Sequence, residues 1–356
     1  HLGYGGVEKA IASLCNILVQ KYDVEIISVY KLYEQPAFNI DERVKITYLL
    51  DKELSPNKEE LKVAIKDRNL FEILKQATKS AKILRFKKTK MIKAIEDIKS
   101  GIVISTRIEH NNLLSIYGNK KLITIAQEHT YHNNDEKYIK NLVKSCENID
   151  YFIPVSKELT GFYSEYFKNT NTKCMFIPHS LDYIPEEKSS LEGKNIISIG
   201  RLSPEKGFDD LIDIFKIVHE NRQDWKLNII GDGTEKDKLI KKIKENYLEK
   251  SVILHGYRDK QYINNQLMNS SIYAMASHEE SFGLVLIEAQ SFGIPCIAFD
   301  SAKGACEIIE DEVSGYLIKD RSKQNMADKV IELIDNREFR TTMGAKGREN
   351  SNNYST

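Results

Sequence analysis

The sequence predicts an α/β protein built from two Rossmann-like domains, each with a doubly wound parallel sheet. Short apolar segments alternate with helical segments throughout the second half of the chain, a pattern typical of parallel strands joined by helices. At 356 residues the chain is longer than one ordinary hydrophobic core requires, so two cores are expected. A polar stretch over residues 184–194 has the composition of a linker between them.

This linker sets the predicted domain boundaries. Residues 1–183 are expected to form the N-terminal domain and residues 184–340 the C-terminal domain, with a last helix beginning in residues 341–356. A glycine-rich turn enters the first helix without a preceding strand. Such a turn normally follows a strand, so we expect the first strand and the end of the last helix to lie outside this sequence.

The composition narrows the class of protein. Lys plus Arg and Asp plus Glu are both 52, so the charge balance argues neither for nor against nucleic acid. The five cysteines have no C-x-x-C spacing, which favours reduced thiols of a cytosolic protein over a disulfide or zinc framework. No apolar run approaches the roughly 18 residues of a membrane span, and we expect no signal peptide.

The first half opens with a turn at Gly5 and Gly6, followed by an amphipathic helix over Val7–Gln20. The amides of such a turn can hold a phosphate or a sugar, although a plain turn would have the same sequence. Strands are then predicted at residues 24–30, 43–50, 101–106, 121–127 and 151–156.

The segment from Asn57 to Lys99 is predicted to be helical and is rich in lysine. Between Ile73 and Ile95 it has eight Lys or Arg and no acid. A basic amphipathic helix can lie on an anionic membrane surface; the alternative is a core-facing helix with a solvated basic face. Its apolar residues at helical spacing are Leu74, Ala77, Ala81, Leu84, Met91, Ile95 and Ile98.

Polar residues follow two predicted strands of the first half. Arg107 and Glu109 come after the strand at residues 101–106, and His129 comes after the strand at residues 121–127. In an α/β domain the strand ends face the ligand crevice. His129 is therefore a candidate for hydrogen bonding a substrate hydroxyl; the alternative is a structural histidine.

The second half predicts six strand–helix units. The strands are expected at residues 195–200, 226–231, 252–256, 271–276, 294–299 and 315–318. The helices are expected at residues 208–220, 235–247, 260–269, 282–292, 305–310 and 323–334.

The turn at residues 279–283 has the most informative chemistry. It enters a predicted helix, whose first amides are unpaired donors suited to a pyrophosphate. Glu280 lies before that helix, and Glu288 lies within it and leans toward its start. An anion cradle with two carboxylates suits a sugar nucleotide; the alternative is a capped helix with a solvated glutamate. The amides concerned are those of Phe282, Gly283 and Leu284.

A second strand-to-helix loop, at residues 200–207, contains Arg201 and Lys206. A guanidinium fork and a mobile ammonium group could together neutralise a leaving pyrophosphate without a metal. The sequence has no carboxylate cluster of the kind that a magnesium site needs, so no metal is expected. The loop at residues 255–258 could frame a base.

Six short motifs occur along the chain: Gly5–Glu8, Ile177–Asp182, Gly200–Gly207, Ile230–Gly233, Glu280–Glu288 and Gly293–Pro295. In this order and spacing they resemble the retaining glycosyltransferases of family 4, the "glycosyl transferases group 1" domain. The resemblance covers nearly the whole chain and is strongest over residues 195–318. It implies the GT-B architecture, with two Rossmann-like domains facing a central cleft and a last helix that crosses back to the N-terminal domain.

The resemblance also implies a role for each site residue. Arg201 and Lys206 would hold the donor diphosphate, Glu280 the sugar hydroxyls and Glu288 the ribose. The amides of the 282–284 turn would support phosphate and sugar. The remaining expected contacts are Gly6 from the opposing domain, His129 beside the sugar, and Tyr257 and Arg258 at the base. One departure is Pro178-His179-Ser180, where the family commonly has Pro-Asn-Gly.

The predicted function is transfer of a hexosyl group, with retention, from a nucleoside diphosphate sugar, a UDP sugar by family frequency. The expected acceptor is a glycan or a lipid-linked sugar of cell-envelope or capsular polysaccharide synthesis. The protein is expected in the cytoplasm or on the inner face of the cell membrane, with no resident cofactor. The alternatives are a GT-B sugar-nucleotide epimerase and a non-catalytic partner subunit of a glycosyltransferase. A nucleic-acid partner is not expected, because aromatic residues are not interleaved in the basic helix.

Overall fold

The chain forms two compact units in a computed structural model. The first unit comprises His1–Pro154 and Glu158–Ile177, and the second comprises Val155–Lys157 and Pro178–Thr356. The structure describes every residue except 4, 182 and 356. Asp182, the last residue of one predicted motif, therefore lies outside the described residues.

The first unit contains parallel strands in two sheets. β1 (Glu25–Tyr30) pairs with β2 (Lys45–Leu50), and a four-stranded sheet has the order β3-β4-β5-β6. Its strands are β3 (Gly101–Ser105), β4 (Leu122–Glu128), β5 (Tyr151–Pro154) and β6 (Lys173–Cys174). Its other elements are α1 (Gly6–Leu18), η1 (Lys52–Leu54), α2 (Lys58–Lys66), α3 (Leu70–Asp97), α4 (Ile108–Tyr117), α5 (Glu136–Ser145) and α6 (Lys157–Phe167).

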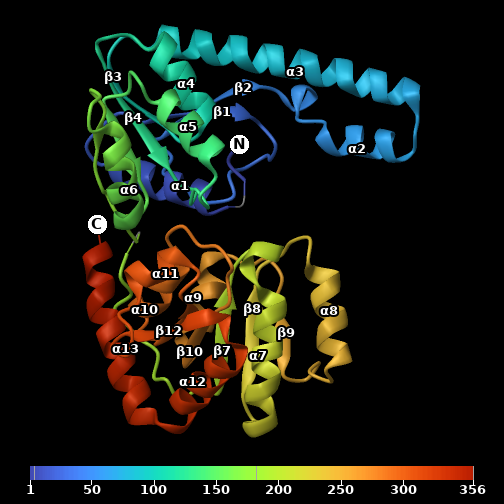
Figure 1. The fold of residues 1–356 in the computed structure, drawn as a ribbon, viewed down its shortest axis with the longest axis vertical. Coiled ribbons are helices and arrows are strands. Elements are labelled where there is room, and N and C mark those ends of the chain that lie inside the picture. Colours follow the sequence, from blue (N-terminus) through green and yellow to red (C-terminus); the bar gives the residue numbers. More distant parts are fainter. Residues whose placement is uncertain (4, 182, 356) are drawn as a thin grey trace. The chain divides into compact units, whose positions relative to one another are not determined.

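The segment over residues 57–99, which was predicted to be helical, forms two helices, α2 and α3. Arg68 has a φ of 51°, a left-handed conformation that no α-helix continues through. Asn69 then begins α3, because its side chain accepts a hydrogen bond from the amide of Glu72, as an N-cap residue does. α2 folds back along the N-terminal part of α3 (Figure 1).

The C-terminal half of α3 packs into a hydrophobic cluster of the first unit. Met91 packs with Val29, Leu50 and Leu113. The alternative of a core-facing stripe is therefore wrong for the N-terminal half, where four of the apolar residues are exposed. These are Leu74, Ala77, Ala81 and Leu84.

The second unit is built on a six-stranded parallel sheet with the order β12-β11-β10-β7-β8-β9 (Figure 1). Its first and fourth strands, β7 and β10, are neighbours, and the chain winds outward from them in opposite directions. This is the Rossmann strand order, and its switch point lies between β7 and β10. The strands are β7 (Asn195–Ile199), β8 (Lys226–Ile230), β9 (Val252–Leu254), β10 (Ile272–Met275), β11 (Cys296–Phe299) and β12 (Gly315–Ile318).

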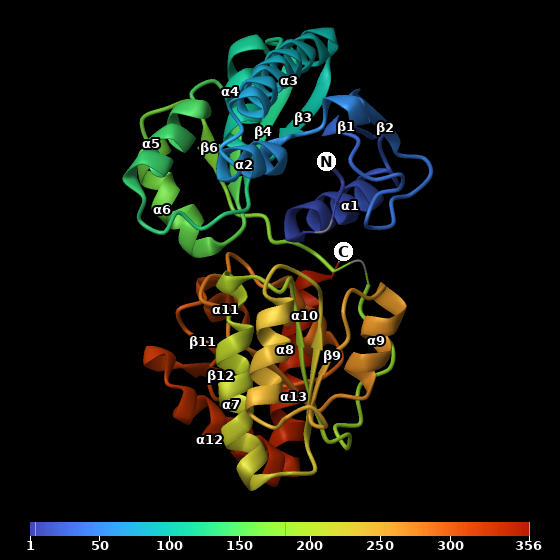
Figure 2. The same ribbon diagram turned by 90° about the vertical axis from the view of Figure 1, so that its right-hand side faces the viewer.

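Helices cover both faces of this sheet. α7, α8 and α12 pack together on one face, and α10, α11 and α13 lie on the other (Figure 2). The apolar stripe of α7, from Phe208 to Val218, is buried. The bounds are α7 (Phe208–Asn221), α8 (Lys236–Glu245), α9 (Lys260–Met268), α10 (Leu284–Ser291), α11 (Lys303–Ile308), α12 (Lys323–Asp335), α13 (Arg337–Ser351), η2 (Pro204–Lys206), η3 (Lys319–Arg321) and η4 (Asn352–Tyr354).

Candidate functional site

The switch point of the second unit brings two loops together. One follows β7 and contains Arg201 and Lys206; the other follows β10 and contains Glu280. The amide of His278 donates a hydrogen bond to the carbonyl of Glu205, with N and O 2.8 Å apart. The two loops predicted to carry the chemistry are therefore joined through their backbones at the carboxyl edge of the sheet.

Lys206 and Glu280 form an ion pair between these loops. The Lys206 Nζ lies 2.6 Å from Glu280 Oε2, and the two side chains are 24 % and 16 % exposed. The sequence predicted a cation for the diphosphate and a carboxylate for the sugar, and the structure places these two groups in contact. A ligand that binds here would meet a charged donor and a charged acceptor side by side.

Arg201 lies on the exposed side of the same loop. Its guanidinium is 3.0 Å from Glu205, and its side chain is 63 % exposed. Ser203 donates a hydrogen bond to the same carboxylate oxygen at 2.6 Å. Because Arg201 remains largely in solvent, its fork can reach an incoming anion at a low desolvation cost.

The helix after Glu280 begins at Leu284, two residues later than predicted. Gly283 has a φ of 94° and a ψ of 46°, so a helix cannot include it. Among the described residues, the amides of Phe282, Gly283 and Leu284 have no backbone acceptor. They remain the donors expected at a helix start.

The Phe282 side chain is buried and fixes this turn from behind. His179 lies edge-on to it, with ring centroids 5.3 Å apart, and burial lowers the pKa of His179 to about 4. A Cβ added at Gly304 would lie 2.4 Å from the Phe282 nitrogen, so only glycine allows α11 this close. The Gly304 amide also donates to the carbonyl of Glu280 at 2.8 Å.

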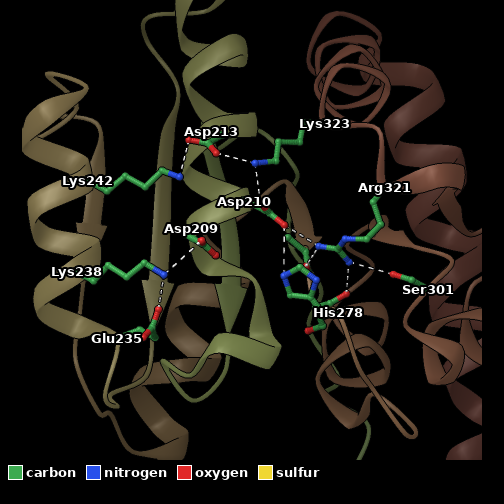
Figure 3. Close-up of polar contacts among 12 residues, drawn as sticks. Asp209, Asp210, Asp213, Glu235, Lys238, Lys242, His278, Ser301, Arg321 and Lys323 are labelled. Carbon is green, nitrogen blue, oxygen red and sulfur yellow. Dashed lines mark hydrogen bonds and ion pairs between the residues drawn. The ribbon is translucent and has the colours of Figure 1, made fainter. Parts of the chain in front are cut away.

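Arg321 connects the segments next to the two loops, the end of β10 and the start of α7 (Figure 3). It donates to the carbonyls of Ala276 and Ser277, at 2.9 and 2.8 Å, where β10 runs into the Glu280 loop. It also donates to Asp210 at 2.8 Å, in the first turn of α7 after the Lys206 loop. Its guanidinium stacks on Phe299 at 4.3 Å from the ring centroid.

Asp210 is the centre of this cluster. Lys323 lies 2.6 Å from its carboxylate, and the His278 Nε2 lies 3.4 Å from it (Figure 3). Burial opposes the charge, but hydrogen bonds from Lys323 and Arg321 hold the pKa of Asp210 below its ordinary value. The carboxylate is therefore ionised at neutral pH and keeps Arg321 in place.

We expect Arg321→Ala to lower the free energy of unfolding by about 1.5–3 kcal/mol, because it removes charge-assisted hydrogen bonds to both loops. Urea unfolding measures this loss. Lys323→Ala is the matched control, since it removes a partner of Asp210 whose ion pairs are with Asp210 and Asp213, both on α7. Equal stability of Arg321→Ala and the unsubstituted chain would show that Arg321 does not hold the loops.

Glu288, on α10, lines a hollow in the second unit. Tyr183 borders the same hollow, 4.7 Å below the Lys260 ammonium group. Neither Arg201 nor Lys206 is among the lining residues. These are Leu181, Tyr183, Pro185, Lys260, Asn264, Glu288, Ser291 and Phe292.

Tyr257 and Arg258 lie in the loop after β9. Tyr257 is 49 % exposed, and the Arg258 guanidinium lies 4.8 Å from the centre of the Tyr262 ring. The Tyr262 hydroxyl is 2.8 Å from His255 Nδ1, and this histidine also contacts Asn228. The loop is thus held by a side-chain network, with an aromatic ring and a cation at its surface.

Two predicted site residues belong to the first unit. Gly6 is the first residue of α1, and a Cβ added there would meet no atom within 4 Å. Nearby in the chain, Glu8 lies 3.8 Å from Arg107. His129 directly follows β4, after a buried Glu128, and burial raises the pKa of Glu128.

Known proteins share both the sequence and the fold. A family model described as "Glycosyl transferases group 1" matches residues 180–350. Two curated relatives align over 98 % of this chain at 28 % identity, an exopolysaccharide phosphotransferase of Streptomyces coelicolor and an uncharacterized glycosyltransferase of Haemophilus influenzae. The second unit of the chain therefore contains a group 1 glycosyltransferase domain. The chain spans 92 % of the length of the Haemophilus relative but 38 % of the Streptomyces one.

Solved structures show that the chain has the GT-B fold. Staphylococcus aureus TarM, solved with fondaparinux, α-GlcNAc-glycerol and UDP, matches with a TM-score of 0.67 at 26 % identity, over 76 % of this chain and 56 % of that one. Anabaena HepE, solved with UDP and glucose, matches with a TM-score of 0.70 at 16 % identity, over 99 % and 92 % of the two chains. The second likeness establishes the fold across both units.

Three residues of the site could not be identified from the sequence: Arg321, Asp210 and Gly304. Arg321 and Asp210 are ordinary charged residues in the sequence, separated by 111 positions. The one available signal for Gly304 is a glycine directly after a lysine, at the start of a predicted helix. Glycine is a poor helix former, so a glycine there indicates that another stretch of backbone approaches closely.

Proposed function

We propose that the chain transfers a hexosyl group from a nucleoside diphosphate sugar to an acceptor hydroxyl, with retention at the anomeric carbon. The observation that carries this proposal is the convergence of Lys206, Glu280 and the start of α10 at the switch point of the second sheet. Ligands of open α/β sheets bind at this position. The amides of the helix start suit phosphate oxygens, and a carboxylate beside them suits sugar hydroxyls.

Transfer needs stabilisation of the negative charge that develops on the leaving diphosphate. Arg201, Lys206 and the amides of the 282–284 turn would supply positive charge where the diphosphate leaves, and electrostatic stabilisation of this kind is usually the largest single contribution to catalysis. When the diphosphate arrives, Lys206 can exchange part of its contact with Glu280 for a phosphate oxygen. Glu280 then accepts hydrogen bonds from the donor sugar.

The remaining donor contacts are assigned by position. Glu288 lines a hollow beside α10, where its carboxylate would accept the ribose hydroxyls. Tyr257 and Arg258 present a ring and a cation that would flank the base. Gly6 and His129, from the first unit, would complete the sugar site. UDP is the proposed nucleotide, and the UDP complexes of TarM and HepE support it.

The proposed acceptor is a glycan or a lipid-linked sugar of cell-envelope or capsular polysaccharide synthesis, used in the cytoplasm or at the inner face of the membrane. The polysaccharide and poly(ribitol-phosphate) substrates in the names of relatives support it. Arg107, paired with Glu8, and Glu109, paired with Lys87, lie together in the first unit and would contact this acceptor. No described helix is both long enough and apolar enough to cross a bilayer.

We expect one nucleotide among UDP, GDP and ADP to stabilise the protein in the presence of EDTA. A ligand at 100 times its dissociation constant stabilises a fold by about 2.7 kcal/mol, which thermal unfolding detects. Metal is excluded from the assay because Arg201, Lys206 and the helix amides already supply the positive charge. Among described residues, no group of three or more His, Cys, Asp or Glu could hold a metal ion.

The matched variants are Lys206→Ala and Lys236→Ala. Lys236 is also paired with an acid, Asp232 at 2.9 Å, in the same unit. The first variant should lose the stabilisation, and the second should keep it. If calorimetry and thermal unfolding detect no nucleotide binding in EDTA, or detect binding only with a divalent cation, the proposed donor site is wrong.

A further inference from the structure

The N-terminal half of α3 exposes an apolar stripe within the first unit. Leu70, Leu74 and Leu84 are 81 %, 69 % and 61 % exposed. With Ala77 and Ala81 they follow one another at steps of four and three residues, so they form one continuous line along the helix. Phe71, beside Leu70, is 79 % exposed.

The stripe is left bare although α3 has a packing partner. α2 covers a different face of α3, where Asn57 donates to the Gln76 carbonyl at 2.9 Å and accepts from Ser80. Ile83, on that same face, is 3 % exposed. The two helices extend beyond the sheets of their own unit (Figures 1 and 2). An exposed apolar line of this length usually marks a surface that another body covers.

Basic side chains flank the stripe. Lys75, Lys79 and Lys82 succeed one another on the next face of α3, and Arg85 lies between them and Leu84. Among the described residues, Lys79, Lys82 and Arg85 make no ion pair with an acid. Lys75 pairs with Glu72 at 3.2 Å, so the uncompensated positive charge beside the apolar side chains is that of Lys79, Lys82 and Arg85.

We propose that this surface of α3 docks on an anionic lipid bilayer. Leu70, Phe71, Leu74 and Leu84 enter the boundary between headgroups and acyl chains, and the neighbouring lysines contact lipid phosphates. An apolar face with lysines along its border is the pattern of interfacial helices, and anionic headgroups supply the charge that complements it. The proposal does not depend on the transfer reaction, and its test requires no donor.

A second copy of the chain fits the surface less well. Two such stripes packed together would bring their lysine rows into proximity. Glu72 already pairs with Lys75 and no acid lies between Ile73 and Ile95, so Lys79, Lys82 and Arg85 of the two copies would lie close together without a counter-charge from α3. Like charges at close range oppose association. The positive charge of this surface therefore favours binding to an anionic bilayer over binding to a second copy of the chain.

Vesicle co-sedimentation tests the proposal. The chain is mixed with vesicles of phosphatidylcholine alone or of equal parts phosphatidylcholine and phosphatidylglycerol, at low and high salt. We expect binding to the anionic vesicles only, and weaker binding at high salt because salt screens the phosphate contacts. A stripe variant should bind at least about tenfold less well, because each leucine lost removes apolar burial. It contains Leu70→Ser, Leu74→Ser and Leu84→Ser.

Two further variants separate the contribution of the lysines from that of the apolar side chains. Lys79→Gln with Lys82→Gln should weaken binding to anionic vesicles and reduce its salt dependence. A control with Ile240→Ser and Tyr247→Ser removes apolar side chains that are 49 % and 90 % exposed in the second unit, and should bind like the unsubstituted chain. All substituted residues are exposed, so circular dichroism should show an unchanged fold.

Three outcomes would overturn the proposal. The first is no binding to either vesicle. The second is equal binding of the stripe variant and the unsubstituted chain. The third is a dimer in analytical ultracentrifugation that the stripe variant abolishes, which would make this face an interface between copies.

Discussion

We expect Lys206→Ala to slow sugar transfer by about one to two powers of ten, because it removes a charge-assisted contact to the leaving diphosphate. Lys206 is 24 % exposed and lies 2.6 Å from Glu280, so it is held at the site before any ligand binds. Removing it also leaves the Glu280 carboxylate beside the incoming phosphate without its cation. Steady-state kcat/KM, with the donor that the nucleotide screen identifies, measures the effect.

The Lys206–Glu280 pair calls for a double-mutant cycle. Glu280→Ala alone should also slow transfer. The double variant should lose less transition-state stabilisation than the two single variants added together, because each single variant leaves the partner's charge unpaired. Lys236→Ala, on α8, should leave kcat/KM unchanged. A Lys206→Ala enzyme with full kcat/KM, or strictly additive losses, would contradict the shared role of the pair.

The strands of the second unit could be predicted from sequence because each is a short apolar run that ends at a glycine or a polar residue. β7 ends before Gly200 and β8 before Gly231, and both glycines mark the turn into the next loop. This pattern also placed Arg201 and Lys206 on a loop at the carboxyl edge. It did not give the order of strands, because pairing β7 with β10 depends on contacts between segments about 75 residues apart.

Local conformation explains the late start of α10. Apolar periodicity from Phe282 onward is compatible with a helix, but periodicity is insensitive to backbone angle. Gly283, with φ at 94°, excludes the preceding residues from the helix. The result is a turn in which Phe282 is buried and its amide is oriented by the turn rather than by helical geometry.

Periodicity also failed on α3 for a physical reason. A helical pattern of apolar residues predicts a helix but does not say what covers each face. Two apolar faces are present on α3, one around Ile83 that α2 covers and one from Leu70 to Leu84 that remains exposed. Arg321 was missed for a related reason, because two of its four acceptors are backbone carbonyls, which any residue supplies.

We expect Gly207→Ala to destabilise the second unit and to impair transfer together. Gly207 has a φ of 59° and a ψ of 30°, and a side chain in this left-handed region costs about 1–2 kcal/mol. A Cβ there would also lie 2.1 Å from the Ala276 carbonyl oxygen. Relieving this clash by moving the backbone costs about 1–3 kcal/mol more. The movement would displace Lys206 on one side and the Glu280 loop on the other.

Gly256→Ala separates the two costs of Gly207→Ala. Gly256 has a φ of 69°, but the nearest atom to an added Cβ is Asp232 Oδ2 at 3.8 Å, so this variant should show the conformational cost alone. In urea unfolding, the free energy of unfolding of Gly207→Ala should therefore be lower than that of Gly256→Ala by the cost of the clash, about 1–3 kcal/mol. Equal losses of stability in the two variants would show that the Lys206 loop can move away from Ala276 at little cost. In that case, the contact between Gly207 and the end of β10 would not be what holds Lys206 against Glu280.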